Sequence, residues 1–159
     1  MNNIEISLRG IENSPECSTR RTMHTPEEIE FFILNVLDKL GKQNWNLSVL
    51  FCNNAVIQEL NKQYRNLDEP TDVLSFIMGE TAGERYMAGD IAISLEMAEE
   101  NARCFGIFID DELRRLLIHG ILHLSGMDHK SNDKDEPMLI LQEKILAELH
   151  TGIKHKEHV

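Results

Sequence analysis

This sequence shows no sign of a membrane span, a disulfide framework or a thiolate metal site. No segment of the 159 residues approaches the run of about 18 apolar residues that a membrane helix needs, and the N-terminus has no basic region followed by an apolar run. The cysteines, Cys17, Cys52 and Cys104, are odd in number, widely spaced and without a C-x-x-C pair. We therefore expect a cytoplasmic protein with no membrane partner, in which Cys52 serves only for packing.

Positive charge is also scarce. The chain has 16 Lys and Arg residues against 27 Asp and Glu residues, which gives a formal net charge of −11. A field of this sign does not attract nucleic acid, so any binding to RNA would need a local basic patch. The sequence offers three candidate patches, each with the alternative of being solvated surface, which is favoured for the first and third: Arg20-Arg21, Lys62 with Arg65, and Arg114-Arg115.

The chain has enough apolar residues for one globular domain. With 42% hydrophobic residues in 159, we expect residues 1–150 to form a single domain and residues 151–159 to form a flexible tail. Hydrophobic periodicity predicts strands at 4–8, 47–52, 72–78 and 89–94, and helices at 26–40, 54–65, 95–105, 110–124 and 135–150. The fold class is therefore α+β, with a small mixed sheet of about four strands packed against about five helices.

Local signals mark several boundaries of these elements. Thr25, Asn53 and Ser94 are typical N-caps, while Asp110 or Asp111 is expected to open the fourth helix. The run at 47–52 is apolar enough for a central strand, and the next two strands could form a hairpin. Loops are predicted at 11–24 and 79–87. The fourth helix is apolar almost all round, so we expect it in the middle of the domain.

That helix carries the motif H-x-x-x-H-x-x-G-x-x-H. His119 and His123 are four residues apart, so both imidazoles leave the same face of a helix and can share one ion. Gly126 can adopt the left-handed conformation that ends a helix, which would bring His129 back toward the same point. The spacing therefore predicts three imidazole ligands to one ion.

Three neutral ligands with an open position are typical of a catalytic zinc, although imidazoles also suit nickel, copper and iron. Such an ion favours hydrolysis. The spacing matches the metzincin proteases, but their general base is a glutamate directly after the first histidine, and this chain has Gly120 there. The sequence thus argues against a protease while leaving the metal site intact.

Two further blocks accompany the histidine motif, which reads His119-Gly120-x-Leu122-His123-Leu124-x-Gly126-x-Asp128-His129. They are Asn61-x-x-Tyr64-Arg65-x-x-Asp68-x-Pro70-Thr71-Asp72-Val73-Leu74-Ser75-Phe76 and Gly89-Asp90-Ile91. Together these blocks resemble the bacterial YbeY endoribonucleases. With the order of elements between them, the resemblance covers about residues 45–150.

The resemblance implies a zinc-dependent endoribonuclease that cuts single-stranded RNA in small-subunit ribosomal RNA maturation and ribosome quality control. It implies one Zn²⁺ held by His119, His123 and His129, with Arg65 as the catalytic arginine. Ribosomal RNA and small-subunit ribosomal proteins would be the partners.

Two other functions remain open at this point. One is a metal-dependent hydrolase of a peptide or small molecule, and the other is a non-catalytic ribosome assembly factor whose metal braces the fold. Asp128 can orient a histidine or form a turn, and Asp72, Ser75 and Asp90 can line the cleft or end strands. The oligomeric state is not predicted.

Overall fold

Four strands form one mixed sheet in the order β1-β2-β4-β3. In the computed structural model, which describes residues 1–11 and 25–157 and side chains up to position 149, the strands are β1 (Asn3–Arg9), β2 (Trp45–Cys52), β3 (Val73–Ala82) and β4 (Arg85–Ser94). β1, β2 and β4 run parallel, and β3 pairs antiparallel to β4 as a hairpin. The sequence-based expectations of a mixed sheet and of a central β2 are confirmed.

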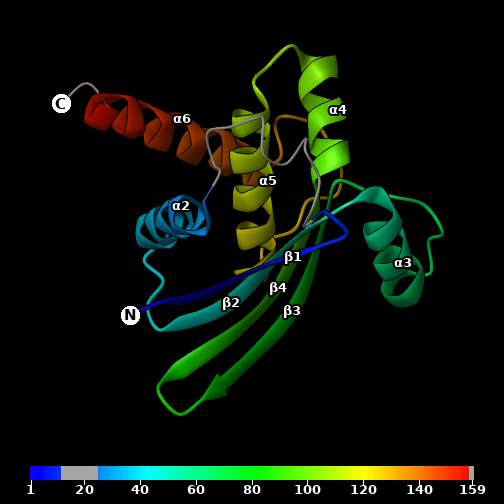
Figure 1. Ribbon diagram of the computed structural model, residues 1–159. Helices are drawn as coiled ribbons and strands as arrows, with labels where there is room; N and C mark the ends of the chain where they lie inside the picture. Colours follow the sequence, from blue (N-terminus) through cyan, green and yellow to red (C-terminus); the bar gives the residue numbers. More distant parts are fainter. Residues whose placement is uncertain (12–24, 158–159) are drawn as a thin grey trace.

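Alternate side chains of the sheet pack into two apolar clusters. Leu47, Val49 and Phe51 of β2 belong to the larger cluster, together with buried residues of α2 (Pro26–Lys39), α5 (Ile109–Leu124) and α6 (Pro137–Glu157). Cys52 of β2 faces the other way and packs with Ile57 of α3 (Asn54–Arg65). Figure 1 shows α2, α5 and α6 over one face of the sheet, with α3 apart from them.

The helix that carries two of the motif histidines, α5, lies at the centre of the fold. It contacts α2, α6 and α4 (Leu95–Phe105), as well as β3 and β4. Its side chains are buried almost all round, as the sequence predicted. A Cβ atom added to Gly120 would lie 2.9 Å from the side chain of Ile91 on β4, so the missing side chain allows the helix to approach the sheet closely.

Three predicted boundaries were wrong. Residues 79–87 are not a loop, because β3 and β4 resume pairing after an irregularity between Ile77 and Glu80 and turn only beyond Ala82. Gly79 has a φ of 67°, which fits this irregularity rather than a loop end. α5 begins at Ile109 without a side-chain cap, and the predicted capping aspartates lie in its first turn, where they favour the helix dipole. α6 extends beyond the predicted end at 150.

Some predictions concern residues outside those described. These are the loop at 12–24, which contains Cys17 and Arg20-Arg21, and the side chains of the tail. Among the described residues, no helix combines the length and apolar character needed to cross a bilayer.

Candidate metal centre

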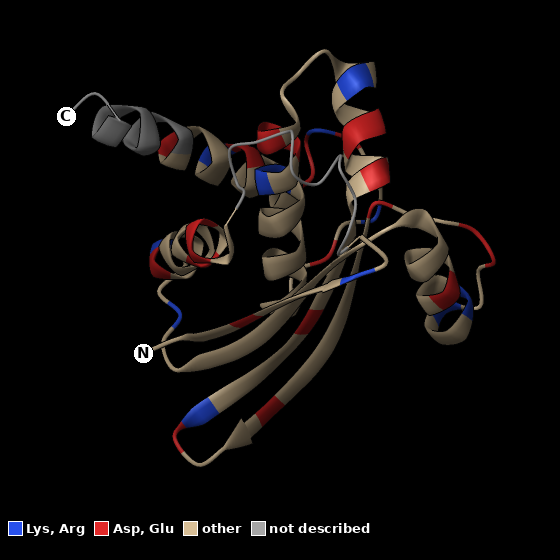
Figure 2. Cartoon of the chain, in the orientation of Figure 1, with Lys and Arg blue, Asp and Glu red and all other residues tan. Residues whose placement is uncertain are grey.

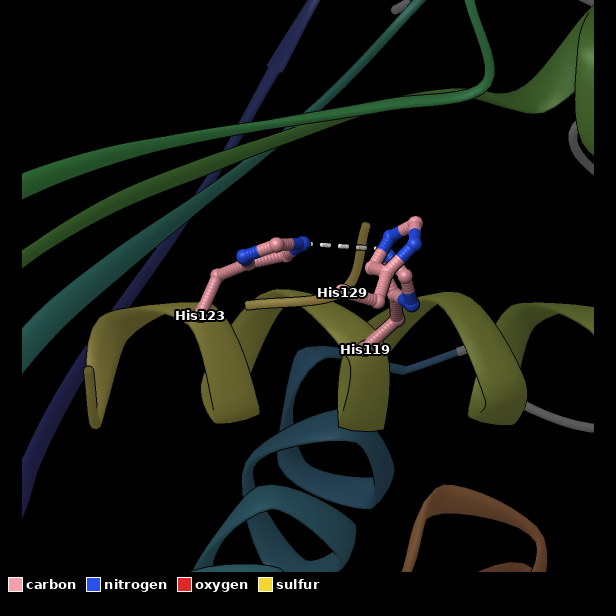
Figure 3. Close-up of side chains that lie close together, drawn as sticks. All are labelled: His119, His123 and His129. Atoms are coloured by element: carbon pink, nitrogen blue, oxygen red, sulfur yellow. Dashed lines mark hydrogen bonds between the residues drawn. The ribbon is translucent and has the colours of Figure 1, made fainter. Parts of the chain in front are cut away.

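The three motif histidines come together. One nitrogen of each ring lies within 4.8 Å of the corresponding nitrogens of the other two, and the Nε2 atoms of His119 and His123 are 3.1 Å apart. Figure 3 shows the three rings gathered beside α5, with His129 contributed by the segment that follows the helix. The sequence placed these residues correctly around one point.

The end of α5 explains how His129 reaches this point. The N–H of Gly126 donates to the carbonyl of His123 at 3.0 Å, and the N–H of Met127 donates to the carbonyl of Leu122 at 3.1 Å. This pair of bonds is the Schellman motif, which requires a positive φ at the residue after the helix cap. Gly126 has a φ of 97°, and the chain reverses there. His129 follows three residues later.

The donor set fits a single divalent ion. In a tetrahedral zinc site with Zn–N distances of 2.0–2.1 Å, ligand nitrogens are about 3.3 Å apart, so small side-chain movements would complete the geometry. Among the described residues, no thiolate or carboxylate joins the three imidazoles in this group. Three protein ligands leave a position for a reactant, which is typical of catalytic rather than structural sites.

The surroundings favour the neutral imidazoles that bind metal. Burial lowers the pKa of His119 and, together with the nearby His129, outweighs the hydrogen bond to Gln142 that would raise it. Burial also lowers the pKa of His123, and the adjacent His119 adds to this effect. Metal ions compete with protons for these nitrogens, so lowered pKa values keep both lone pairs available near neutral pH.

A cleft of about 540 Å³ opens beside His119 and His123. Strand β3 supplies one side of it and the end of α5 supplies the other. Its lining residues are Arg65, Val73, Leu74, Ser75, Ile77, His119, His123, Gly126, Met127 and Asp128.

Arg65 shares this cleft with the histidines although it comes from α3. Its Nη2 donates to the Ser75 carbonyl at 2.5 Å, and its guanidinium carbon lies 5.5 Å from the centre of the Phe76 ring. The hydrogen bond to Ser75 uses one of the five N–H donors of the Arg65 guanidinium group. Lys62 is exposed in the same last turn of α3, but unlike Arg65 it does not line the cleft.

The other described pair of arginines is not a free basic patch. Arg114 pairs with Asp111 at 3.2 Å, while Arg115 pairs with Glu112 and Glu143, each at 2.9 Å. Figure 2 shows basic residues spread over several elements among acidic ones.

Four predicted polar residues have different positions. Ser75 lines the cleft and donates to the Gly120 carbonyl at 3.4 Å, whereas Asp72 accepts from Val73 and Asn101 at the start of β3. Asp128 accepts from the His129 N–H at 2.8 Å and also lies 3.9 Å from His123 Nδ1. Asp90 accepts from the Ser48 hydroxyl and does not line this cleft.

Two residues beside the histidines were not foreseen. The carbonyl of Ser131 lies 2.8 Å from His129 Nδ1, and the side chain of Gln142 lies 2.7 Å from His119 Nδ1. Gln142 is only 6% exposed, although it is a polar residue of the last helix. The available signal was its spacing, because Gln142 lies four residues after Met138 and three before Ile145, and both of these apolar residues are buried.

Gly120 occupies the position at which metzincins carry their glutamate, and the structure shows why that comparison fails. The missing side chain would point at Ile91 in the sheet instead of into the cleft. The site therefore has the histidine spacing of that protease class without its general base.

The fold and site define an α+β protein with a candidate three-histidine metal centre, and the comparisons give its family. The family model described as "Endoribonuclease YbeY" matches residues 13–150. The endoribonuclease YbeY of Treponema denticola is 52% identical over 128 residues, covering 77% of this chain and 83% of that protein. The one from Borrelia turicatae is 52% identical over 120 residues, covering 74% and 81%. The chain belongs to the endoribonuclease YbeY family.

A solved structure agrees with this assignment. The solution structure of a Thermotoga maritima protein is similar to the fold with a TM-score of 0.62 at 31% identity, covering 96% of this chain and 93% of that one. The likeness extends over almost the whole length of both chains.

Proposed function

We propose that this protein is a metal-dependent endoribonuclease that cuts single-stranded RNA, and that it acts in small-subunit ribosomal RNA maturation and ribosome quality control. The observation that carries the proposal is the meeting of three imidazoles beside an open cleft that Arg65 lines together with His119 and His123. Membership of the endoribonuclease YbeY family supports RNA as the substrate. The metal we propose is one Zn²⁺.

Each residue has a defined part in this proposal. His119, His123 and His129 would hold the ion, which when bound would supply a concentrated positive charge that polarises a phosphoryl oxygen. Arg65 would bind the same phosphate with its remaining N–H donors and stabilise the negative charge that develops during cleavage. An RNA chain carries a 2′-hydroxyl beside every phosphate, so the reaction does not require a glutamate at position 120.

An exposed aromatic ring suited to an unpaired base lies next to Arg65. Tyr64 is 58% exposed and packs edge-on against Phe76 at a ring separation of 5.2 Å, directly beside Arg65. Stacking on aromatic rings and phosphate binding by neighbouring cations are the usual means of holding single-stranded nucleic acid. With a net charge of −11, the rest of the molecule adds no attraction, which favours delivery of the RNA by a ribosomal protein partner.

Two substitutions separate the proposed roles. His123→Ala should reduce both bound zinc and RNA cleavage, while Arg65→Ala should retain zinc and reduce kcat by about 10²–10³-fold, as loss of one charge-stabilising donor does elsewhere. Cleavage of an RNA with single-stranded ends would be measured before and after chelation, alongside metal analysis of the purified protein. Arg103→Ala on α4 is the matched control, because this arginine is 73% exposed and does not line the cleft. Undiminished cleavage by both variants would refute the proposal.

A further inference from the structure

Gln142 is a buried polar residue beside the candidate metal centre. It lies on α6 and is 6% exposed. Its Oε1 lies 2.7 Å from His119 Nδ1, and its Nε2 donates to the Glu143 carboxylate at 3.0 Å. The amide is therefore held at both ends, with a histidine on one side and a carboxylate on the other.

The carboxylate dictates which way the amide points. Arg115 donates to both oxygens of Glu143, at 2.9 and 3.0 Å. Although burial raises it, the pKa of Glu143 is lowered by the hydrogen bonds from Arg115 and Gln142, so the group stays ionised and can only accept. The amide NH₂ of Gln142 must face Glu143, and its carbonyl oxygen must face His119.

This order of donors and acceptors also determines which ring nitrogen of His119 carries the proton. A carbonyl oxygen accepts only, so the His119 nitrogen that meets it, Nδ1, must carry the hydrogen. The other ring nitrogen, Nε2, then has a free lone pair, and it is the atom that lies 3.1 Å from His123. A metal ligand needs this tautomer.

The arrangement is anchored well away from the cleft. Arg115 also donates to Glu112 at 2.9 Å, and Asn101 of α4 donates to the same carboxyl group at 3.0 Å. Glu112 is only 2% exposed. Hydrogen bonds thus connect α4, α5 and α6 with the ring of His119.

We infer that Gln142 is a positioning residue: oriented by the Glu143–Arg115 pair, it fixes His119 with hydrogen on Nδ1 so that Nε2 faces the ion. The inference deepens the proposed function, because it rests on His119 being a metal ligand. Gln142 does not line the cleft.

The test reads the tautomer directly in metal-free protein. Nitrogen NMR of the histidine rings at a pH where they are neutral should show His119 with hydrogen on Nδ1. Gln142→Met keeps the length of the side chain but removes the acceptor, so the fraction with hydrogen on Nε2 should rise and zinc affinity should fall by about 10–100-fold.

Ile145→Val is the matched control. Ile145 is buried on the same helix, so this variant loosens packing without touching His119, and both the tautomer and the zinc affinity should stay as in the parent.

The inference is overturned if unmodified protein shows His119 with hydrogen on Nε2, a result that needs no variant to fold. It is also overturned if Gln142→Met changes neither readout, or if Ile145→Val changes both equally. If the tautomer shifts as expected while the parent protein never cuts RNA, the proposed function fails and the positioning role stands.

Discussion

The three histidines differ in which group of the protein lies against their Nδ1 atoms. His129 Nδ1 meets a backbone carbonyl, that of Ser131, which no substitution of a side chain removes. His119 Nδ1 depends on a side chain from another helix, Gln142. His123 Nδ1 is 3.9 Å from the Asp128 carboxylate, too far for a hydrogen bond. His119 is therefore the candidate ligand whose geometry is most open to change by mutation.

The thiols of Cys52 and Cys104 should differ sharply in reactivity. Cys52 is fully buried, its Sγ donates to the Ile93 carbonyl at 3.5 Å, and burial raises its pKa to about 11. Only about one in a thousand Cys52 thiols would be ionised at pH 8, and the thiolate is the reactive form. Brief treatment with iodoacetamide at pH 8 should label the exposed Cys104 and spare Cys52, as read by peptide mass spectrometry.

Unfolded protein provides the control for this experiment. In urea both thiols should react at similar rates, because burial no longer separates them. Labelling of Cys52 in the folded protein at the rate of Cys104 would contradict its assignment as a core residue.

At the scale of whole elements, the sequence predicted best what depends on neighbours along the chain. The caps of α2, α3 and α4 are confirmed, since Thr25, Asn53 and Ser94 each accept from the N–H three residues later. The hairpin β3–β4 was predicted too short, because its outer pairs depend on a partner strand and on an irregularity that one strand's pattern does not reveal. Sequence patterns among neighbouring residues therefore predict where a helix begins, but they do not predict how far two strands pair.

In the candidate site, too, some residues could be predicted from local sequence and others could not. The histidine cluster follows from helix geometry and one glycine, so the motif sufficed to predict it. The position of Arg65 in the same cleft requires α3 to lie across from the end of α5, which no local pattern predicts and which only the family resemblance suggested. Gln142 was missed because its burial comes from the packing of α6 against α5.

Gly120 tests how closely α5 must approach the sheet. Gly120→Ala should gain up to about 1 kcal/mol from helix propensity, but the new Cβ would meet three atoms of Ile91 at 2.9–3.0 Å. Ile91 is 1% exposed and cannot move freely, and overpacking of this kind costs about 1–3 kcal/mol. Packing should win, so the urea midpoint should fall with an unchanged slope.

A double-mutant cycle checks the physical reason. In an Ile91→Val background the loss from Gly120→Ala should shrink, because one of the crowding atoms is gone. An alanine variant as stable as the parent, or more so, would show that the helix and sheet are not in tight contact at this point.

At the scale of the whole molecule, net charge predicts a weak salt dependence of RNA binding. Arg65 lines the cleft and Lys62 lies in the same last turn of α3, on a chain of net charge −11. Each phosphate contact with a single strand contributes about −0.7 to the slope of log K against log salt, so the expected slope is about −1.4. Binding of a short single-stranded RNA would be followed between about 50 and 200 mM salt. Lys62→Ala should reduce the slope by about half, Arg103→Ala should leave it unchanged, and a slope steeper than about −4 would mean that a larger basic surface takes part.

Removal of the metal tests whether the three histidines hold an ion, and Arg65→Ala then distinguishes an enzyme from a protein that the metal only braces. An ion bound by the native state alone stabilises it by about 2.7 kcal/mol at one hundred times its Kd. For a chain of 159 residues this corresponds to a loss of roughly 5–11 °C in Tm on chelation. The loss should be absent in His123→Ala, because that variant no longer completes the ligand set.

A brace and a catalytic ion both predict this shift in Tm on chelation. They differ in Arg65→Ala, which leaves the three ligands untouched and should keep the full metal-dependent Tm while cutting RNA more slowly. A parent protein that shows the shift but never cleaves RNA would be a metal-braced assembly factor.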